Sequence, residues 1–165
     1  IEQLLTLARI DTLGDAATEP CRLRDIAAEE IAAIAPTALD QNVRLELTEG
    51  DEVIVRGNPV LLRILLRNLL DNAVRHTLPG TSVRINVVNE QGQNSLSVTD
   101  NGPGIPEPEL ARVAERFYRP LGTRANGSGL GLSIVKRIAE IHAASLQLAP
   151  RKDGSGLCVT VIFKS

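Results

Sequence analysis

The chain has 165 residues, 43% of them apolar and 23% charged, and its formal net charge is −2. This balance fits one globular domain and excludes a disordered chain, which would be poor in apolar residues and far from neutral. The near-neutral charge and the aromatic content of 2% argue against nucleic-acid binding, which relies on neutralising phosphates or stacking bases on rings. Two of the three aromatic residues, Phe117 and Tyr118, are neighbours.

The two cysteines, Cys21 and Cys158, argue against a zinc site or a disulfide framework. We therefore expect two buried thiols in a reducing compartment. No apolar run approaches the roughly 18 residues of a membrane span, and no signal peptide opens the chain. The chain begins at Ile1 within a helical pattern and contains no methionine, which is typical of a fragment of a longer protein.

The first 20 residues are expected to be an appendage of the main domain. Apolar positions at helical spacing in residues 1–10 predict the end of an amphipathic helix. Residues 11–20 contain a glycine and a proline and predict a linker. This pattern separates residues 1–20, helix end and linker, from a single domain over residues 21–165.

The first half of the domain predicts two helices and two strands. Helical spacing indicates a helix over 22–35, and short apolar or alternating runs indicate strands over 42–48 and 53–55. The strongest helical pattern covers 59–76, where apolar side chains form one stripe. The stripe consists of Leu62, Leu65, Leu66, Leu69 and Ala73.

The second half alternates strands, glycine-rich loops and helices. In chain order we expect strands over 82–88 and 95–100, a loop over 101–108, a short helix over 107–114, a loop over 119–129, a helix over 130–142, strands over 145–149 and 157–163, and a turn at Lys152-Asp153-Gly154. Helices on one side and largely antiparallel strands on the other predict an α/β fold, a two-layer sandwich with a mixed sheet.

The long helix carries a polar face opposite its leucines. Asn68 and Asn72 are four residues apart, so they share this face, which Arg75 and His76 continue. Amide oxygens suit Mg²⁺, which keeps waters and substrate phosphates in its shell. From the helix alone, two exposed or helix-bonded asparagines are the slightly favoured interpretation.

A second polar feature follows the strand over 95–100. Asp100 ends this strand and precedes a loop with Gly102 and Gly104. A carboxylate there suits a donor such as an adenine amino group, and glycines allow close backbone approach. The same residues are also turn formers, so a plain surface turn is an equal alternative.

Two further segments lie before and at the start of the helix over 130–142. The glycine-rich run 127–132 would form an anion site at a helix start, and the alternative is a flexible hinge. It is neither a Walker A loop nor a Rossmann turn. The run 115–120 places arginines, which suit phosphate, around the two neighbouring aromatic rings. The alternative there is a surface loop with one buried phenylalanine.

The order of four motifs resembles that of the bacterial sensor histidine kinases. N-L-L-D-N-A, D-N-G-P-G-I, E-R-F-Y-R and G-S-G-L-G-L-S-I-V-K-R-I stand where that family has its N, G1, F and G2 boxes, and the resemblance covers roughly residues 22–165. The details are most similar to the quorum-sensing or polymyxin-resistance type. The resemblance implies the Bergerat (GHKL) ATPase fold, shared with DNA gyrase.

The resemblance also implies roles for the residues of the first two boxes. Asn72 would be the Mg²⁺ ligand, with Asn68 near the phosphates and Arg75 in contact with them. His76 stands where many members have a tyrosine near the adenine. Asp100 would accept the adenine amino hydrogen. The base would enter past three residues, Gly102, Gly104 and Ile105.

In the other two boxes the resemblance implies phosphate contacts and a lid over roughly 115–128. Arg116 and Arg119 would reach phosphate when the lid closes, with Phe117 tethering it and Tyr118 more exposed. The residues lining the triphosphate would be Gly127, Ser128, Gly129, Leu130, Gly131 and Leu132. The residues expected to act in phosphoryl transfer are Asn68, Asn72, Arg75 and Arg119.

The implied function is transfer of the γ-phosphoryl group of Mg-ATP to a histidine on an upstream dimerisation domain, for relay to a response regulator aspartate. Only His76 and His142 occur here and neither has the context of an acceptor, so this chain should bind Mg-ATP without phosphorylating itself. His142 is expected to be a structural helix-end residue, followed by Ala143 where the family often has glycine. The family further implies a homodimeric full-length protein, a fragment free to be monomeric, no nucleic-acid partner, and the cytoplasmic side of a bacterial inner-membrane protein.

Two other functions stay open. One is another enzyme of the same fold, a gyrase-type ATPase or an anti-sigma-factor serine kinase. The absence of glutamate between Leu61 and His76 disfavours the ATPase, which would need a base to activate water. The other is a non-catalytic, ATP-sensing interaction module, which the four intact motifs disfavour.

Overall fold

The computed structural model describes residues 2–14, 18–104, 131–151 and 155–164. Its centre is a five-stranded sheet in the order β2-β4-β5-β7-β6. β2 pairs with β4 in parallel, and the other neighbours are antiparallel. The strands are β2 (Arg44–Leu47), β4 (Ser82–Glu90), β5 (Gln93–Thr99), β6 (Ser145–Pro150) and β7 (Leu157–Phe163).

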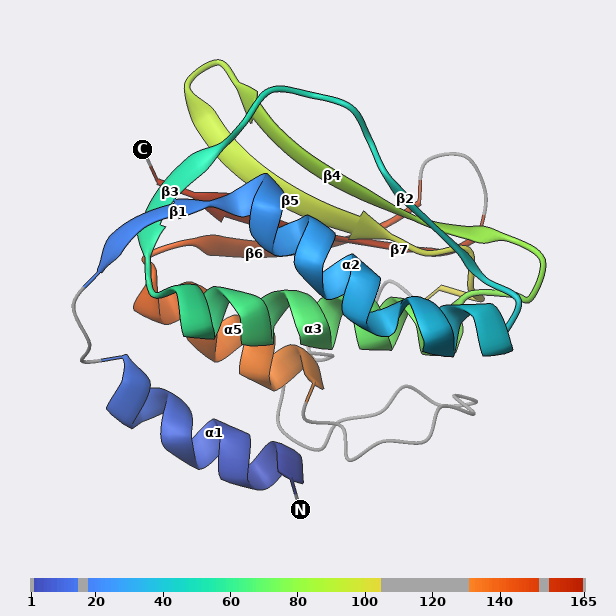
Figure 1. Cartoon of the computed structure of the whole chain (residues 1–165), viewed down its shortest axis with the longest axis horizontal. Coiled ribbons are helices and arrows are strands. Elements are labelled where there is room, and N and C mark those ends of the chain that lie inside the picture. Colours follow the sequence, from blue (N-terminus) through green and yellow to red (C-terminus); the bar gives the residue numbers. More distant parts are fainter. Residues whose placement is uncertain (1, 15–17, 105–130, 152–154, 165) are drawn as a thin grey trace.

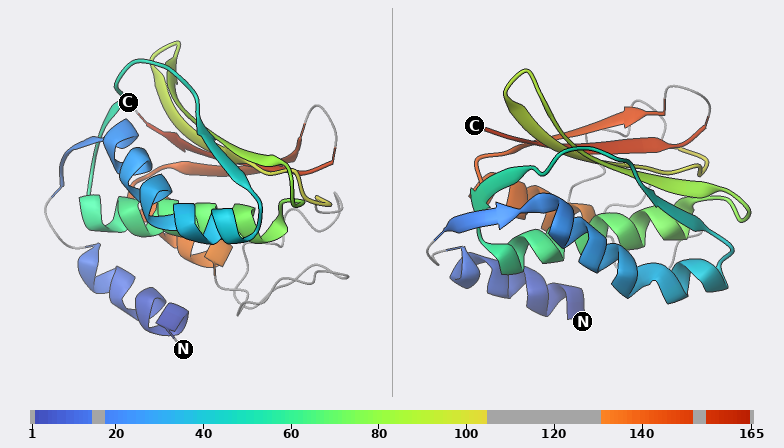
Figure 2. Two further views of the ribbon diagram at one scale, coloured as in Figure 1. Left: turned by 45° about the vertical axis from the view of Figure 1, so that its right-hand side comes forward. Right: turned by 45° about the horizontal axis from the view of Figure 1, so that its top comes forward.

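Three helices cover one face of this sheet (Figure 1). They are α2 (Leu23–Asp40), α3 (Pro59–His76) and α5 (Gly131–Ile141). Both rotated views keep the helices on the same side (Figure 2). The predicted two-layer sandwich with a mixed sheet is therefore confirmed.

The core lies between the two layers. The predicted apolar stripe of α3 is buried there, with its five side chains no more than 3% exposed. Alternate residues of β7, such as Val159 and Val161, face these helices, while their neighbours lie on the other face of the sheet. Of the two cysteines, Cys21 is buried as expected. Cys158 is only partly buried, because it lies on the opposite face of β7 and pairs with Thr99.

Several elements differ in extent from the sequence-based expectation. α2 continues to Asp40, past Pro36, and ends where Asn42 adopts a positive φ of 57° and the Val43 N–H donates to the Ala38 carbonyl. This bond closes the last helical turn. Asparagine is common just after a helix, because it tolerates the positive φ that such a turn needs. β4 and β5 are longer than expected, because a two-residue turn with positive φ at Gln91 and Gly92 joins them directly.

A second, two-stranded sheet was not expected from the sequence. β1 (Glu19–Arg22) pairs antiparallel with β3 (Ile54–Gly57). The sequence predicts a linker up to residue 20 and a helix from residue 22, because a four-residue strand containing proline has no apolar alternation. Its pairing with β3 is long-range, so no local pattern indicates it.

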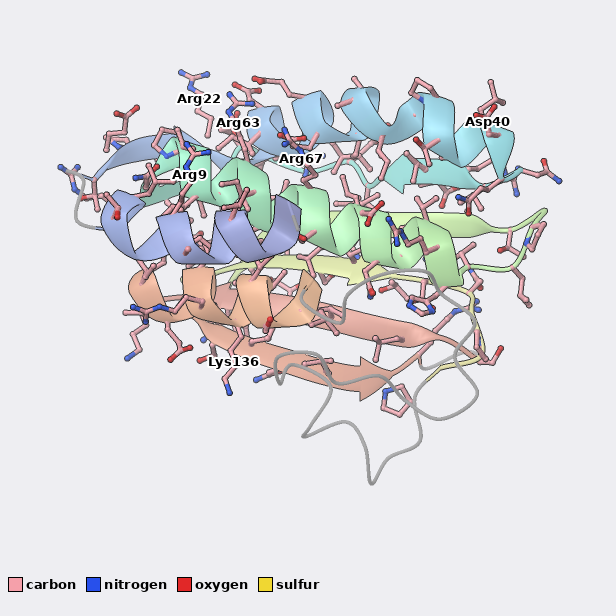
Figure 3. All side chains as sticks on the ribbon, turned by 90° about the horizontal axis from the view of Figure 1, so that it is seen from below. Arg9, Arg22, Asp40, Arg63, Arg67 and Lys136 are labelled. Atoms are coloured by element: carbon pink, nitrogen blue, oxygen red, sulfur yellow. The ribbon has the colours of Figure 1, made fainter. Side chains whose placement is uncertain are left out.

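The first helix, α1 (Glu2–Leu13), packs on the helix layer (Figure 3). Ile10 is fully buried, and Gly14 lies close to the Ile141 side chain of α5. Asn58 joins α1 to α3 here. Its Nδ2 donates to the Leu13 carbonyl at 3.0 Å, and its Oδ1 accepts from the first N–H groups of α3.

His142 completes the junction at the end of α5. Its Nε2 accepts from the Asn58 N–H at 3.1 Å, so its Nδ1 carries the proton and donates to the Ile138 carbonyl at 2.8 Å. The ring also meets Phe163 edge-on, with centroids 6.5 Å apart. The expected structural role of His142 at a helix end agrees with these contacts.

Candidate functional site

The polar face of α3 lies against the start of α5. The Asn68 Nδ2 donates to the Ile64 carbonyl at 2.8 Å, which fixes the side chain and leaves its Oδ1 directed away from the helix. A Cβ added to Gly131, the first residue of α5, would lie 3.8 Å from this oxygen. Asn72, one turn further on, is half-buried and forms no hydrogen bond with any residue that the structure describes. The Asn68 Oδ1 thus lies near the start of α5, and the unpaired Asn72 amide lies one turn further along the same face of α3.

Arg75 is engaged within its own helix. Its Nε lies 3.1 Å from Asp71 Oδ2, an i, i+4 ion pair in which both side chains are more than one-third exposed. An exposed pair of this kind contributes about 0.3–0.5 kcal/mol. A stronger anion such as a phosphate would therefore readily attract the guanidinium away from Asp71.

Asp100 is the most buried charged residue in the described part of the chain, with 3% of its surface exposed. Its Oδ1 accepts the N–H groups of Gly102 at 2.9 Å and Leu157 at 3.1 Å. Its backbone N–H donates to the Leu157 carbonyl at 2.9 Å. Among the described residues, no group donates to Oδ2. The carboxylate is anchored through one oxygen, and the other is free to accept from a ligand.

Burial dominates the electrostatics of Asp100 and of its neighbour His76. Burial raises the pKa of the Asp100 carboxyl, although the N–H groups of Gly102 and Leu157 and the charges of His76 and Arg151 act in the opposite direction. Burial also lowers the pKa of His76, against the attraction of Asp100. His76 is thereby favoured as the neutral imidazole.

The glycines beside Asp100 permit close backbone packing. A Cβ at Gly102 would lie 2.2 Å from the His76 carbonyl oxygen, so this glycine seats the loop on the end of α3. Gly104 has a φ of +79° and packs against Gly156. A Cβ at Gly156 would lie 2.2 Å from the Asp100 carbonyl oxygen. Both glycine positions predicted beside the base thus have structural reasons to lack a side chain.

Three residues near Asp100 had no role in the sequence-based prediction. The Thr77 Oγ1, buried at the end of α3, accepts the Asn101 N–H at 2.9 Å. Asn101 also donates to the Ser82 carbonyl and accepts from Arg151. No local signal in the sequence could join Arg151 to Asn101, since 50 residues separate them.

The remaining predicted residues are only partly described. Leu132 is buried in the core and Gly131 begins α5. The lid, the short helix over 107–114 and the turn at 152–154 lie outside the described residues. The same holds for seven of the predicted ligand contacts, Ile105, Arg116, Arg119, Gly127, Ser128, Gly129 and Leu130, and for Phe117 and Tyr118.

The donors present fit Mg²⁺ held together with a nucleotide rather than by the protein alone. No cluster of three or more histidine, cysteine or acidic side chains suited to a metal occurs in the described part of the chain. The unpaired Asn72 amide and the outward Asn68 Oδ1 are neutral oxygen donors on one helix face. Mg²⁺ takes few protein ligands when substrate phosphates complete its shell.

A family model for the histidine kinase-, DNA gyrase B- and HSP90-like ATPases matches residues 57–165. The chain belongs to this family. The match covers α3, Asp100, α5 and the last two strands, so the described parts of the candidate site lie within the ATP-binding domain.

Known sensor kinases are similar to nearly the whole chain. Sensor protein QseC of Escherichia coli K12 is 42% identical over 158 residues, covering 93% of this chain and 34% of the relative. Sensor protein kinase PmrB of Pseudomonas aeruginosa is 41% identical over 167 residues, covering 99% and 34%. The chain therefore spans about a third of the length of these relatives. The resemblance to the quorum-sensing and polymyxin-resistance type is confirmed.

The fold has a close counterpart among solved histidine kinases. The mycobacterial sensor histidine kinase MprB superposes with a TM-score of 0.76 at 28% identity, covering 89% of this chain and 97% of that one. Among the helices that the structure describes, none has the length and apolar composition of a membrane span.

Proposed function

We propose that this chain is the catalytic, ATP-binding domain of a bacterial sensor histidine kinase. The observation that carries the proposal is the arrangement of two polar features along α3. Asp100, with one free oxygen, lies at the end of α3, and the asparagine face begins two turns earlier, opposite α5. The eight steps from Asn68 to His76 span about 12 Å along the helix, which separates a position for the base from a position for the phosphates.

Each end of this arrangement suits one end of ATP. The free Oδ2 of Asp100 accepts the adenine amino hydrogen, and neutral His76 lies beside the base. Towards the other end, Asn68 would orient the phosphates and Asn72 would hold Mg²⁺. Arg75, which is next to His76, would leave Asp71 and extend to the phosphates. The backbone N–H groups at the start of α5, from Gly131 and Leu132, suit the phosphate charge. When bound, Mg²⁺ supplies neutralisation of charge on the transferring phosphoryl group.

Roles for the residues outside the described part complete the proposal. Under this proposal Arg116 and Arg119 would reach the phosphates from the lid, and the glycine-rich segment 127–130 would line the triphosphate. Ile105 would contribute to the contact with the base. These residues would supply the positive charge and the N–H donors that phosphoryl transfer needs around the γ-phosphate.

The acceptor is a histidine of a separate dimerisation domain. A nitrogen of that histidine attacks the γ-phosphorus, the bond to the bridging oxygen of ADP breaks, and the imidazole releases its proton. The two histidines of this chain do not suit the role, since His142 engages both ring nitrogens and His76 is half-buried against Asp100. The phosphoryl group then passes to an aspartate of a response regulator. The full-length protein is a homodimer of the bacterial inner membrane, with this domain in the cytoplasm.

The absence of a glutamate on α3 favours transfer over hydrolysis. Radiolabelled ATP therefore provides the test, with this chain and with a longer protein that carries the dimerisation domain. We expect ATP binding by both, and an acid-labile, base-stable phosphohistidine only in the longer protein. Asn72→Ala should remove most Mg²⁺-dependent binding and transfer, whereas Asn89→Ala, on the distant β4–β5 hairpin, should not. Rapid release of inorganic phosphate without protein labelling would instead identify an ATPase.

A further inference from the structure

The turn between β6 and β7 clamps the segment that carries Asp100. The Arg151 N–H donates to the Gly156 carbonyl at 3.1 Å, and its guanidinium donates to Asn101 Oδ1 and reaches the Ser155 carbonyl at 3.5 Å. Arg151 therefore bonds to Gly156 through its backbone and holds the residue next to Asp100 through its side chain. It is partly buried, which limits the competition from water.

Asn101 has all of its polar groups occupied by partners from different elements. Its N–H donates to Thr77 Oγ1 at the end of α3, and its Nδ2 donates to the Ser82 carbonyl at the start of β4. Its own carbonyl accepts from the Leu78 N–H at 3.4 Å. Arg151 supplies the remaining donor, to Oδ1. Without Arg151, this oxygen would lose its protein partner. Among the described residues, no other residue after β6 bonds to the Asn101 amide.

Asp100 is held from the same side. Leu157 donates to its Oδ1 and accepts from its N–H, and Gly156 packs on its backbone closely enough that a Cβ there would overlap the Asp100 carbonyl. The Arg151 side chain lies along Gly156, with its Cδ 3.3 Å from that Cβ position. The ionisable groups that act on the Asp100 carboxylate are His76 from α3 and Arg151, and of these two Arg151 brings a fixed positive charge.

We propose that Arg151 is a positioning residue for nucleotide recognition, which holds Asn101 so that the free oxygen of Asp100 stays aimed at the adenine amino group. This inference rests on the proposed function and extends the binding site to the last hairpin of the chain. Arg151 itself touches no nucleotide. Its contribution is to selectivity for the amino group, exerted through Asn101 and the backbone of Asp100.

Calorimetric titration with two nucleotides tests the proposal on the full chain. One is ATP, and the other is purine riboside triphosphate, which lacks only the 6-amino group. We expect the unmodified protein to prefer ATP by about 10–100-fold, the value of a hydrogen bond to a charged group. Arg151→Met, which keeps the length but removes charge and donors, should reduce this preference at least threefold. Arg151→Lys should restore part of it, and Arg56→Met, at an exposed position of β3, should leave it unchanged.

If Arg151→Met weakens the binding of both nucleotides by the same factor, or of neither, the preference for ATP is unchanged. Either result would overturn the inference, because a merely structural role would not change selectivity. Hydrogen exchange gives a second measurement without ligand, since the Gly102 and Leu157 N–H groups bonded to Asp100 should exchange faster in Arg151→Met and not in Arg56→Met. If the unmodified protein shows no preference for ATP, the adenine role of Asp100 fails and the inference fails with it. A preference that survives in Arg151→Met refutes the inference alone.

Discussion

Replacing Asp100 with asparagine separates the two tasks of this side chain. In the folded protein, Oδ1 accepts from Gly102 at 2.9 Å and from Leu157 at 3.1 Å. An asparagine carbonyl oxygen can take the same place and accept both N–H groups. The amide nitrogen then occupies the position of Oδ2 and presents donors where adenine also presents a donor. The substitution therefore preserves the loop and reverses the polarity seen by the ligand.

The two effects of Asp100→Asn have opposite signs. Loss of a hydrogen bond to a charged acceptor weakens ATP binding by about 1.5–3 kcal/mol, or roughly 10–100-fold in Kd. Stability should instead be unchanged or higher by up to about 1 kcal/mol, because both backbone donors stay paired and a buried charge is removed. For a chain of this length, 1 kcal/mol corresponds to about 2–4 °C in Tm.

The pH dependence follows from the raised pKa of Asp100. The folded protein retains the carboxyl proton to a higher pH than the unfolded chain does. The contribution of Asp100 to stability therefore falls as pH rises above the unfolded pKa of about 3.9, and the full cost is reached above the folded pKa. Since asparagine does not titrate, the stability of Asp100→Asn relative to the unmodified protein should increase from about pH 4 towards neutrality.

Calorimetry with ATP and thermal unfolding at several pH values measure both effects in one pair of proteins. Weaker ATP binding together with an unchanged or higher Tm at pH 7 is the expected result. A strongly lowered Tm would show that asparagine cannot replace the carboxylate in the loop. Unchanged ATP affinity would refute the assignment of the free oxygen to adenine.

Substitutions at three further positions test His76 beside Asp100, the cap of α3 and the turn after α5. The lowered pKa of His76 means that, as pH falls below about 6.5, the unfolded chain takes up the proton before the folded protein does, so stability decreases. His76→Gln should remove this part of the pH dependence. Chemical denaturation of both proteins at pH 5 and 7 measures it. Asn58→Ala should cost about 1.5–3 kcal/mol through loss of the α3 cap and the bond to Leu13, whereas Asn58→Ser keeps an acceptor for the cap and should lose less than this in urea denaturation. Ala143→Gly should raise Tm by about 1–4 °C, because Ala143 has a φ of 54°, and Ala144→Gly, at an ordinary φ, should lower it.

Local periodicity was enough to predict the framework of the fold. The bounds of α3 and β7 match the expectation, because an 18-residue amphipathic pattern and an alternating strand are each specified by neighbouring residues. The β1–β3 ladder was missed, since it depends on a contact between Cys21 and Val55 that neither segment indicates by itself. Extension of α2 past Pro36 was also missed, because burial of Ala38 and the turn at Asn42 determine where that helix ends.

The residues of the candidate site also fall into those that a local pattern indicates and those that depend on long-range contacts. Asn68, Asn72 and Asp100 could be found from spacing and from the motif order, because each belongs to a short segment with a recognisable polar pattern. Gly156 and Arg151 could not, since their importance comes from the register of β5 against β7, which pairs Thr99 with Cys158. That register places the next residue, Asp100, against Leu157 and the turn before it.

The two interpretations of Asp100 left open by its sequence are both compatible with the structure. The bond from the Gly102 N–H to Oδ1 is the local turn that an aspartate two residues before a glycine predicts. That turn uses only one carboxylate oxygen, and the strand partner Leu157 uses the same one. Folding occupies Oδ1 and leaves Oδ2 without a donor among the described residues, so the turn leaves the second oxygen available to a ligand. The turn former and the carboxylate proposed to recognise the nucleotide are therefore the same side chain, and only a substitution that changes one oxygen at a time distinguishes their contributions.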